Sequence, residues 1–205
     1  LEIGWLPVLM RQSANASVNV GTDGFLDASQ SVRLLEIPLV ADRSAGDIHP
    51  YGNPHFQLDP RNIALVATTL VGRLKKLDPT NASYYQSRYE AFVDKWSKAL
   101  VRWQAEAAPL KGMELVVHHS AWVYLEDWLQ LREVGQMEPK PGLPPTAAHL
   151  AELLEVTKTH PVKAFIRSAY QSPRAADWLA ERTGVPEVLI PHTVAATEEA
   201  KDLVT

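Results

Sequence analysis

The chain has 205 residues, of which 46% are hydrophobic and 21% are charged, with a formal net charge of -4 and a pI near 6.0. This composition is typical of one large globular domain or of two small ones that share a core, and it argues against disorder. The acidic balance leaves no basic stripe to neutralise phosphates, so nucleic acid is excluded as a partner. The absence of cysteine excludes disulfides and thiolate ligands.

The first part of the chain predicts a short helix and a long loop. Residues 1–13 carry a proline near the first turn and apolar residues at helical spacing. These apolar residues are Ile3, Leu6, Leu9 and Met10. Turn-forming Gly, Asp and Pro residues recur over 15–53, which predicts a loop with one strand candidate at 34–40.

Two helices follow. Asp59 is a predicted N-cap and Pro60 the first residue of a helix that runs to Leu77. A longer helix is predicted over 81–107, where apolar and aromatic residues recur every three or four positions. At 1.5 Å per residue this helix spans roughly 40 Å, enough to run the height of two lobes. A plain bundle helix is the alternative.

The remainder of the chain alternates short strands with helices. This pattern predicts parallel βαβ units, and hence an α/β fold with a four-stranded parallel sheet flanked by helices. The expected strands are 114–118, 131–135, 163–167 and 187–190. The expected helices are 121–129, a segment opened by Pro144-Pro145-Thr146 that ends near Thr159, and 173–183 before Gly184.

Polar residues follow the expected strands at the edge where parallel sheets bind ligands. They are His118, His119, the segment 136–138, the segment 167–170 and His192. Their position makes this edge a candidate site.

Histidine spacing alone does not select metal ligands. His149 is expected on a helix surface and His160 at a helix C-terminus. His49 and His55 share a loop in which both can simply be solvated, and His119 can be a hydrogen-bonded residue at a strand end. The chain contains no HExxH motif that would settle the question.

Two longer motifs resemble one family. Asn-Pro-His-Phe-Gln-Leu-Asp-Pro at 53–60 resembles the [DN]-P-H-x-W-x-D-P signature of the zinc and manganese solute-binding proteins of ABC importers, the helical-backbone metal receptors. His-Ser-Ala-Trp-Val-Tyr-Leu at 119–125 resembles the metal-binding motif of their second lobe. Further similarity lies at 1–6, 138–145 and 173–185, so the resemblance covers essentially the whole chain.

The resemblance implies two lobes joined by a long, rigid helix. Residues 1–78 would form the remainder of the N-terminal lobe, 79–109 the linking helix and 110–205 the C-terminal α/β lobe. The metal would lie between the lobes, bound by His55 and His119, with His192 in place of the aspartate that follows the family's last strand. A histidine at the second-lobe position favours Zn²⁺, with Mn²⁺ and Fe²⁺ as alternatives.

The sequence departs from the family in four respects. The N-terminal half-lobe, which supplies another ligand histidine, has no counterpart before residue 1, and the C-terminal helix has none after residue 205. Gln57 replaces the usual tryptophan beside His55, and His192 replaces the usual aspartate. We therefore interpret the chain as a fragment, in which an incomplete N-terminal lobe could drive homodimerisation.

The resulting hypothesis is a non-enzymatic, high-affinity receptor that delivers zinc to an ABC transporter permease. It is expected in the periplasm or outside the cell and associated with the membrane, supplied here without its targeting segment. One alternative is a zinc-dependent hydrolase in which His55, His119 and Glu138 hold a metal-bound water. A second alternative is an adhesin-like interaction fragment that binds no metal.

Overall fold

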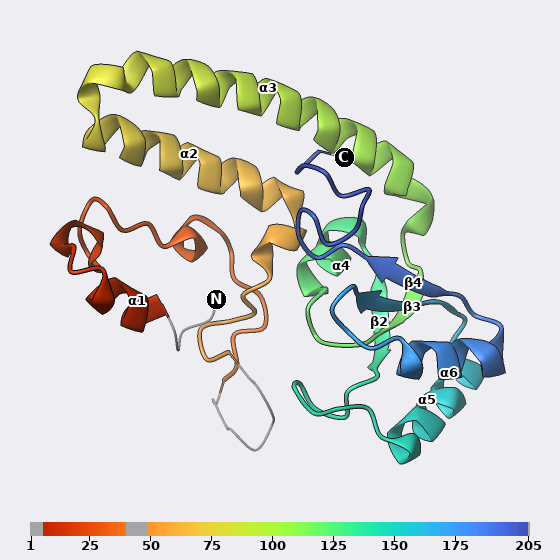
Figure 1. Ribbon diagram of the computed structural model, residues 1–205. Helices are drawn as coiled ribbons and strands as arrows, with labels where there is room; N and C mark the ends of the chain where they lie inside the picture. Colours follow the sequence, from red (N-terminus) through yellow and green to blue (C-terminus); the bar gives the residue numbers. More distant parts are fainter. Residues whose placement is uncertain (1–5, 40–48, 205) are drawn as a thin grey trace.

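The computed structural model describes residues 6–39 and 49–204. A pair of long helices, α2 (Pro60–Leu77) and α3 (Ala82–Ala107), pack against each other along their length. A short helix, α1 (Leu6–Gln12), and the loop after it lie beside α2, while α3 continues toward the sheet, as Figure 1 shows. The expected α1 is therefore confirmed for Leu6–Gln12, and residues 1–5 of that prediction lie outside the described residues.

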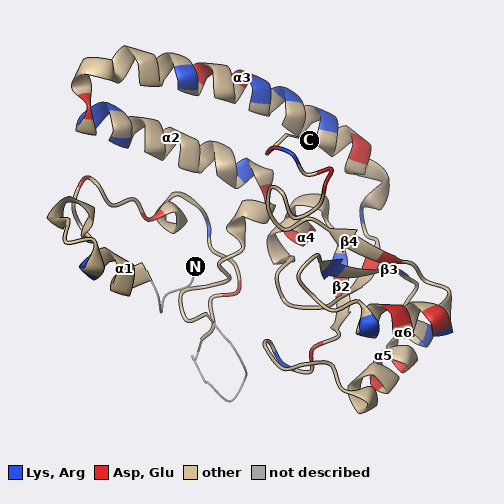
Figure 2. Ribbon diagram, viewed as in Figure 1, with Lys and Arg blue, Asp and Glu red and all other residues tan. Residues whose placement is uncertain are grey.

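The predicted start of α2 is confirmed in detail. Asp59 is buried, its side chain accepts a hydrogen bond from the Arg61 N–H, and Pro60 occupies the first turn. On α3 only Trp96 and Ala99 are fully buried. Charged side chains of both signs occur along α3 (Figure 2), among them the Lys98–Asp94 pair at 2.7 Å. No helix among the described residues is long and apolar enough to cross a membrane.

The C-terminal part contains a four-stranded, entirely parallel sheet, as the sequence predicted. Its strands lie in the order β2-β1-β3-β4. Their bounds are β1 Glu114–Val117, β2 Arg132–Gln136, β3 Val162–Ser168 and β4 Glu187–Ile190. The helices that join them are α4 (Val123–Leu129), α5 (Ala147–Thr159) and α6 (Arg174–Thr183).

The two faces of the sheet have separate cores. On one face Val116 and Phe165 pack with the apolar sides of α5 and α6. On the other face Val117 and Ile166 pack with Trp122, which directly precedes α4. Single turns of 3-10 helix punctuate the loops at Ala16–Val18, Ala28–Ser31, Phe56–Leu58, Pro79–Asn81 and Ala108–Leu110.

The predicted strand at 34–40 is wrong for residues 34–39, which form an irregular loop, and residue 40 lies outside the described part of the chain. The Leu35 N–H donates to the Tyr124 hydroxyl at 3.0 Å, and the Leu35 carbonyl accepts from the Asn53 N–H at 2.8 Å. The backbone N–H and carbonyl of Leu35 are therefore satisfied by isolated hydrogen bonds, in place of the regular hydrogen bonds between strands of a sheet. Helix α4 also begins at Val123 rather than at 121, because residues 119–122 form a turn.

Candidate metal centre

Asn53 holds the loop that presents His55. Its Oδ1 accepts a hydrogen bond from the His55 N–H at 3.0 Å, while its Nδ2 donates to Glu36 Oε2 at 2.8 Å and to the Ser120 carbonyl at 2.9 Å. Asn53 is only 5% exposed, and its three hydrogen bonds lie in a partly buried environment. Asn53 therefore links the first motif, at 53–60, to the second, at 119–125, by a direct hydrogen bond.

Tyr124 makes the second connection between the motifs. Its buried hydroxyl donates to the Asn53 carbonyl at 2.8 Å and accepts from the Leu35 N–H. Arg61 makes a third connection, between the first motif and α4. Its guanidinium group forms ion pairs with the Asp59 carboxylate at 2.7 Å and with Asp127 of α4 at 3.1 Å. Asn53 and Tyr124 thus connect the two motifs by contacts that involve residue types named in each motif.

His119 follows β1 and is oriented by a carboxylate. Its Nδ1 lies 2.7 Å from Glu138 Oε2, which also accepts the Gly142 N–H at 2.8 Å. A carboxylate that binds one imidazole nitrogen favours the tautomer whose other nitrogen is free to bind a metal. Glu138 therefore prepares the Nε2 atom of His119 as a ligand.

His192 follows β4 and packs among aromatic rings. Its ring centroid lies 5.7 Å from that of Trp122 and 6.1 Å from that of Tyr170. The Nε2 atom is buried and has no hydrogen-bond partner. Burial, with a smaller effect of His119, lowers the pKa of His192. A buried nitrogen without a partner is an available ligand.

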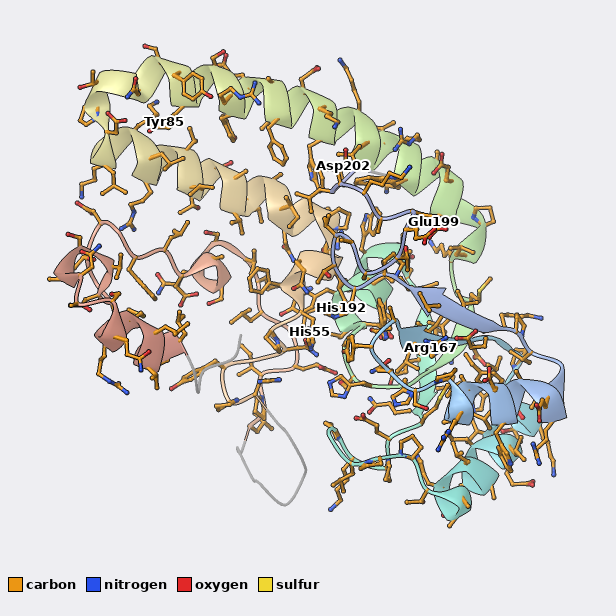
Figure 3. The ribbon with its side chains drawn as sticks, in the orientation of Figure 1. His55, Tyr85, Arg167, His192, Glu199 and Asp202 are labelled. Carbon is orange, nitrogen blue, oxygen red and sulfur yellow. The ribbon has the colours of Figure 1, made fainter. Side chains whose placement is uncertain are left out.

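The other two predicted ligands, His119 and His192, lie close to His55. The His55 ring centroid lies 6.2 Å from that of His119 and 5.0 Å from that of His192. Figure 3 labels His55 and His192, which lie next to each other. Burial lowers the pKa of His55 from 6.5 to about 3, with further effects of His192, His119 and His49. His55 is therefore neutral near pH 7, the form in which imidazole binds a metal.

The three rings do not form a coordination shell in this conformation. Among residues 6–39 and 49–204, no group of three or more His, Asp or Glu side chains is close enough in this conformation to hold an ion. The fold thus brings the rings of His119 and His192 to within 6.2 Å and 5.0 Å of the His55 ring without assembling a metal site.

The other histidines lie elsewhere, apart from His49, whose ring also faces His55. His160 caps α5, as predicted, and its ring bonds Glu114 at 3.1 Å. The ring of His149 on α5 bonds the Gln136 carbonyl at 2.8 Å. His118 is buried beside a separate cavity that Glu138 and Arg174 also line. From the sequence, His49 could simply be a solvated loop residue. The one signal that it lies near His55 was its position just before the motif at 53–60.

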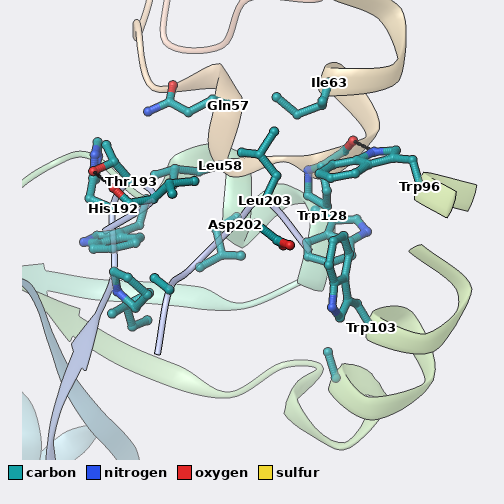
Figure 4. A pocket seen from close by; sticks show the side chains of 18 of the residues that line it. Gln57, Leu58, Ile63, Trp96, Trp103, Trp128, His192, Thr193, Asp202 and Leu203 are labelled. Atoms are coloured by element: carbon teal, nitrogen blue, oxygen red, sulfur yellow. Dashed lines mark hydrogen bonds between the residues drawn. The ribbon is translucent and has the colours of Figure 1, made fainter. Parts of the chain in front are cut away.

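A cavity of about 660 Å³ adjoins His192 on the side of the long helices. Trp96 and Trp103 of α3 and Trp128 of α4 line it (Figure 4), together with the segment after β4. That segment runs back to α3, where the Val204 carbonyl accepts a hydrogen bond from Arg102 at 3.2 Å. Sequence periodicity placed Trp96 and Trp103 on one helix face but did not predict a cavity there.

The family model described as zinc-uptake complex component A, periplasmic, matches residues 1–205. A high-affinity zinc uptake system protein ZnuA of Bacillus subtilis (strain 168) is 25% identical over 202 residues, 97% of this chain and 62% of its own length. A crystal structure of ZnuA superposes with a TM-score of 0.74 at 25% identity, covering 93% of this chain and 69% of that one.

A laminin-binding protein of Streptococcus agalactiae, titled as having adhesin and metal-transporting activity, superposes with a TM-score of 0.66 at 21% identity over 84% of this chain and 63% of its own. At that identity it shows a shared fold. The chain spans 62% of the Bacillus subtilis relative. Because the family model matches every residue of the sequence, the chain belongs to the family of periplasmic zinc-uptake complex component A proteins.

Proposed function

We propose that this chain is the zinc-binding part of a receptor that delivers zinc to an ABC transporter permease, in the periplasm or at the outer face of the cell membrane. The observation that carries the proposal is that the rings of His119 and His192, from two other segments of the chain, lie 6.2 Å and 5.0 Å from the ring of His55. The family match and the zinc-uptake description of the Bacillus subtilis relative support zinc as the cargo.

The ligand chemistry favours zinc over the alternative metals. Neutral imidazole nitrogens bind Zn²⁺ more tightly than Mn²⁺ or Fe²⁺, since affinity at nitrogen sites rises along that series of metals. The nearest carboxylate, Glu138, contacts the Nδ1 atom of His119 and the Gly142 N–H. Glu138 therefore acts through His119 and does not supply the oxygen ligand that manganese prefers.

The long helix α3 suits the role of a rigid connection between two lobes. We assign 1–78 to the first lobe, 79–109 to the linking helix and 110–205 to the second lobe. The bonds of Asn53 to Ser120 and Tyr124 cross this division directly beside the histidines. Metal binding at His55 and His119 would then affect the structure of both lobes.

A non-enzymatic role is favoured over hydrolysis. The hydrolase hypothesis requires Glu138 as a metal ligand, but Glu138 Oε2 is occupied by His119 Nδ1 at 2.7 Å and by the Gly142 N–H. The adhesin-like alternative has only a shared fold in its favour, through the Streptococcus agalactiae protein. Neither the contacts nor the matched descriptions support the predicted homodimer, and we do not propose it.

The proposal is tested by titrating zinc into the chain at pH 7.5 in competition with a chromophoric chelator. His119→Ala should weaken zinc binding at least about tenfold, because it removes a ligand whose outer-shell partners alone are worth about 10–100-fold. His160→Ala is the matched control, since its ring bonds Glu114 and lies outside the cluster. Equal effects of the two substitutions, or no zinc binding by the unchanged chain, would refute the proposal.

A further inference from the structure

A second cavity, of about 570 Å³, lies where α5 and α6 begin. Ala147 of α5 and Ala175 of α6 line it, and these helices follow β2 and β3 in the chain. The cavity is therefore at the carboxyl edge of the parallel sheet, the edge at which such sheets bind ligands. It shares no lining residue with the cavity beside His192.

The N-terminus of α6 is open to a ligand. Its N-cap residue, Pro173, supplies no side-chain hydrogen bond, whereas Thr146 caps α5 by accepting the His149 N–H. The first N–H groups of a helix have no partner within the helix and carry partial positive charge, so they favour an anion. Asp177, the acidic residue of the first turn of α6, is not among the residues that line the cavity.

Arg174 places a full positive charge beside this helix start. It is exposed and lines the cavity, and its guanidinium group forms no hydrogen bond or ion pair with the described part of the chain. Glu138 is the one carboxylate among the described lining residues. Its Oε2 atom already accepts the Gly142 N–H and contacts His119 Nδ1, so its negative charge is partly compensated. Arg174 is thus a cation available to a ligand.

His118 supplies a second polar group that lacks a partner. Val116 of β1 packs with α5 and α6, and alternation along the strand directs His118, two residues later, to the same face. His118 is only 6% exposed and lines the cavity, and its Nδ1 atom is buried without a hydrogen-bond partner. Such a nitrogen costs free energy that a hydrogen bond to a ligand would recover.

The remaining walls of the cavity are mainly apolar. They include the side chains of Pro144, Pro145, Leu150 and Trp178. A cavity of about 570 Å³ is of the size that holds a small organic molecule, and it is larger than a bare phosphate or carboxylate needs. The walls therefore suit a ligand with an apolar body attached to its charged group.

We propose that this cavity binds a small organic anion. Its carboxylate or phosphate group lies at the start of α6, beside Arg174 and His118, and its apolar part lies against Trp178 and the two prolines. The proposal does not depend on the zinc-binding function, because none of the three predicted zinc ligands lines this cavity.

The test follows the backbone amide resonances of the ¹⁵N-labelled chain during titration with phenyl phosphate, with benzoate and with phenol, each to about 10 mM. At least one of the two anions should shift the amides of Ala175 and Ala176 in the first turn of α6. The anion that binds identifies the charged group that the site takes. Phenol, which has the ring without the charge, should leave these amides unchanged.

Two substitutions with the same change of charge show where the anion binds. Arg174→Gln should raise the dissociation constant of the anion about fivefold, because it removes an ion pair at the mouth of the cavity. Lys158→Gln, in the last turn of α5, should change it less than about twofold, because Lys158 is paired with Glu155 and does not line the cavity. His118→Leu should weaken binding by a factor similar to that of Arg174→Gln, provided that urea unfolding shows it to be folded.

Three results would overturn the proposal. They are no shift of the Ala175 and Ala176 amides with either anion, an equal shift with phenol, and equal effects of Arg174→Gln and Lys158→Gln. Each is independent of whether the chain binds zinc, so failure here would leave the zinc-binding proposal standing.

Discussion

Glu126 of α4 and Glu133 of β2 form a half-buried acidic pair, and Glu126→Gln should stabilise the protein at alkaline pH. Burial raises the pKa of Glu126 from 4.5 to about 8, with the negative charge of Glu133 as the next cause. Burial also raises the pKa of Glu133. The Oε1 atom of Glu126 is buried without a hydrogen-bond partner. Ionising Glu126 in the folded state is therefore unfavourable.

The direction of the pH effect follows from linkage. A carboxyl group whose pKa is raised on folding contributes stability that is fully present below pH 4.5 and is lost as the pH rises through about 8. At about 1.4 kcal/mol for each pH unit the upper limit is ~5 kcal/mol. Both residues are only partly buried, so solvent screening reduces this value, and we expect about 2 kcal/mol between pH 5 and pH 8.

The assay is urea unfolding of the unchanged chain and of Glu126→Gln at both pH values. The amide cannot ionise, so the variant should be about 2 kcal/mol more stable at pH 8 and within about 0.5 kcal/mol at pH 5. Glu155→Gln, which removes only an exposed pair with Lys158, is the control and should show the same small effect at both. A stability difference for Glu126→Gln that does not change with pH would refute the reasoning.

Two further substitutions test the contacts around the histidines. Glu138→Gln replaces the carboxylate that orients His119 Nδ1, so zinc affinity should fall about 10–100-fold in the chelator competition while the unfolding free energy changes little; an unchanged affinity would contradict the orienting role. Tyr124→Phe removes the hydroxyl that bridges Leu35 and Asn53, and urea unfolding should show a loss of about 1–3 kcal/mol, against no loss for Tyr84→Phe, whose residue is 62% exposed. Equal stability of these two variants would contradict the structural role of the bridge.

The regular elements could be predicted because they rest on local patterns. The start of α2 depends on Asp59 and Pro60, and the end of α6 depends on Gly184, whose φ is +73°. The four strands were found within one or two residues, since short apolar runs separated by helices allow few other arrangements. The same reasoning failed at 34–39, where Leu35 bonds a side chain from α4 that no local pattern indicates.

For the candidate site, the sequence by itself indicated the family, which the family match confirms, and it predicted three histidine ligands, which stay a prediction. The motifs at 53–60 and 119–125 were sufficient to indicate the family, because each places a histidine within a run of residue types that resembles that family's signature. Their meeting depended on long-range contacts that the sequence does not display, in particular those of Asn53 with Ser120 and Tyr124.

Only the tertiary structure decided that Glu138 orients His119 and that His49 faces His55. Both depend on how a loop folds back over many residues, and the direction of a side chain in a loop is set by its partners in space and not by its neighbours in the chain.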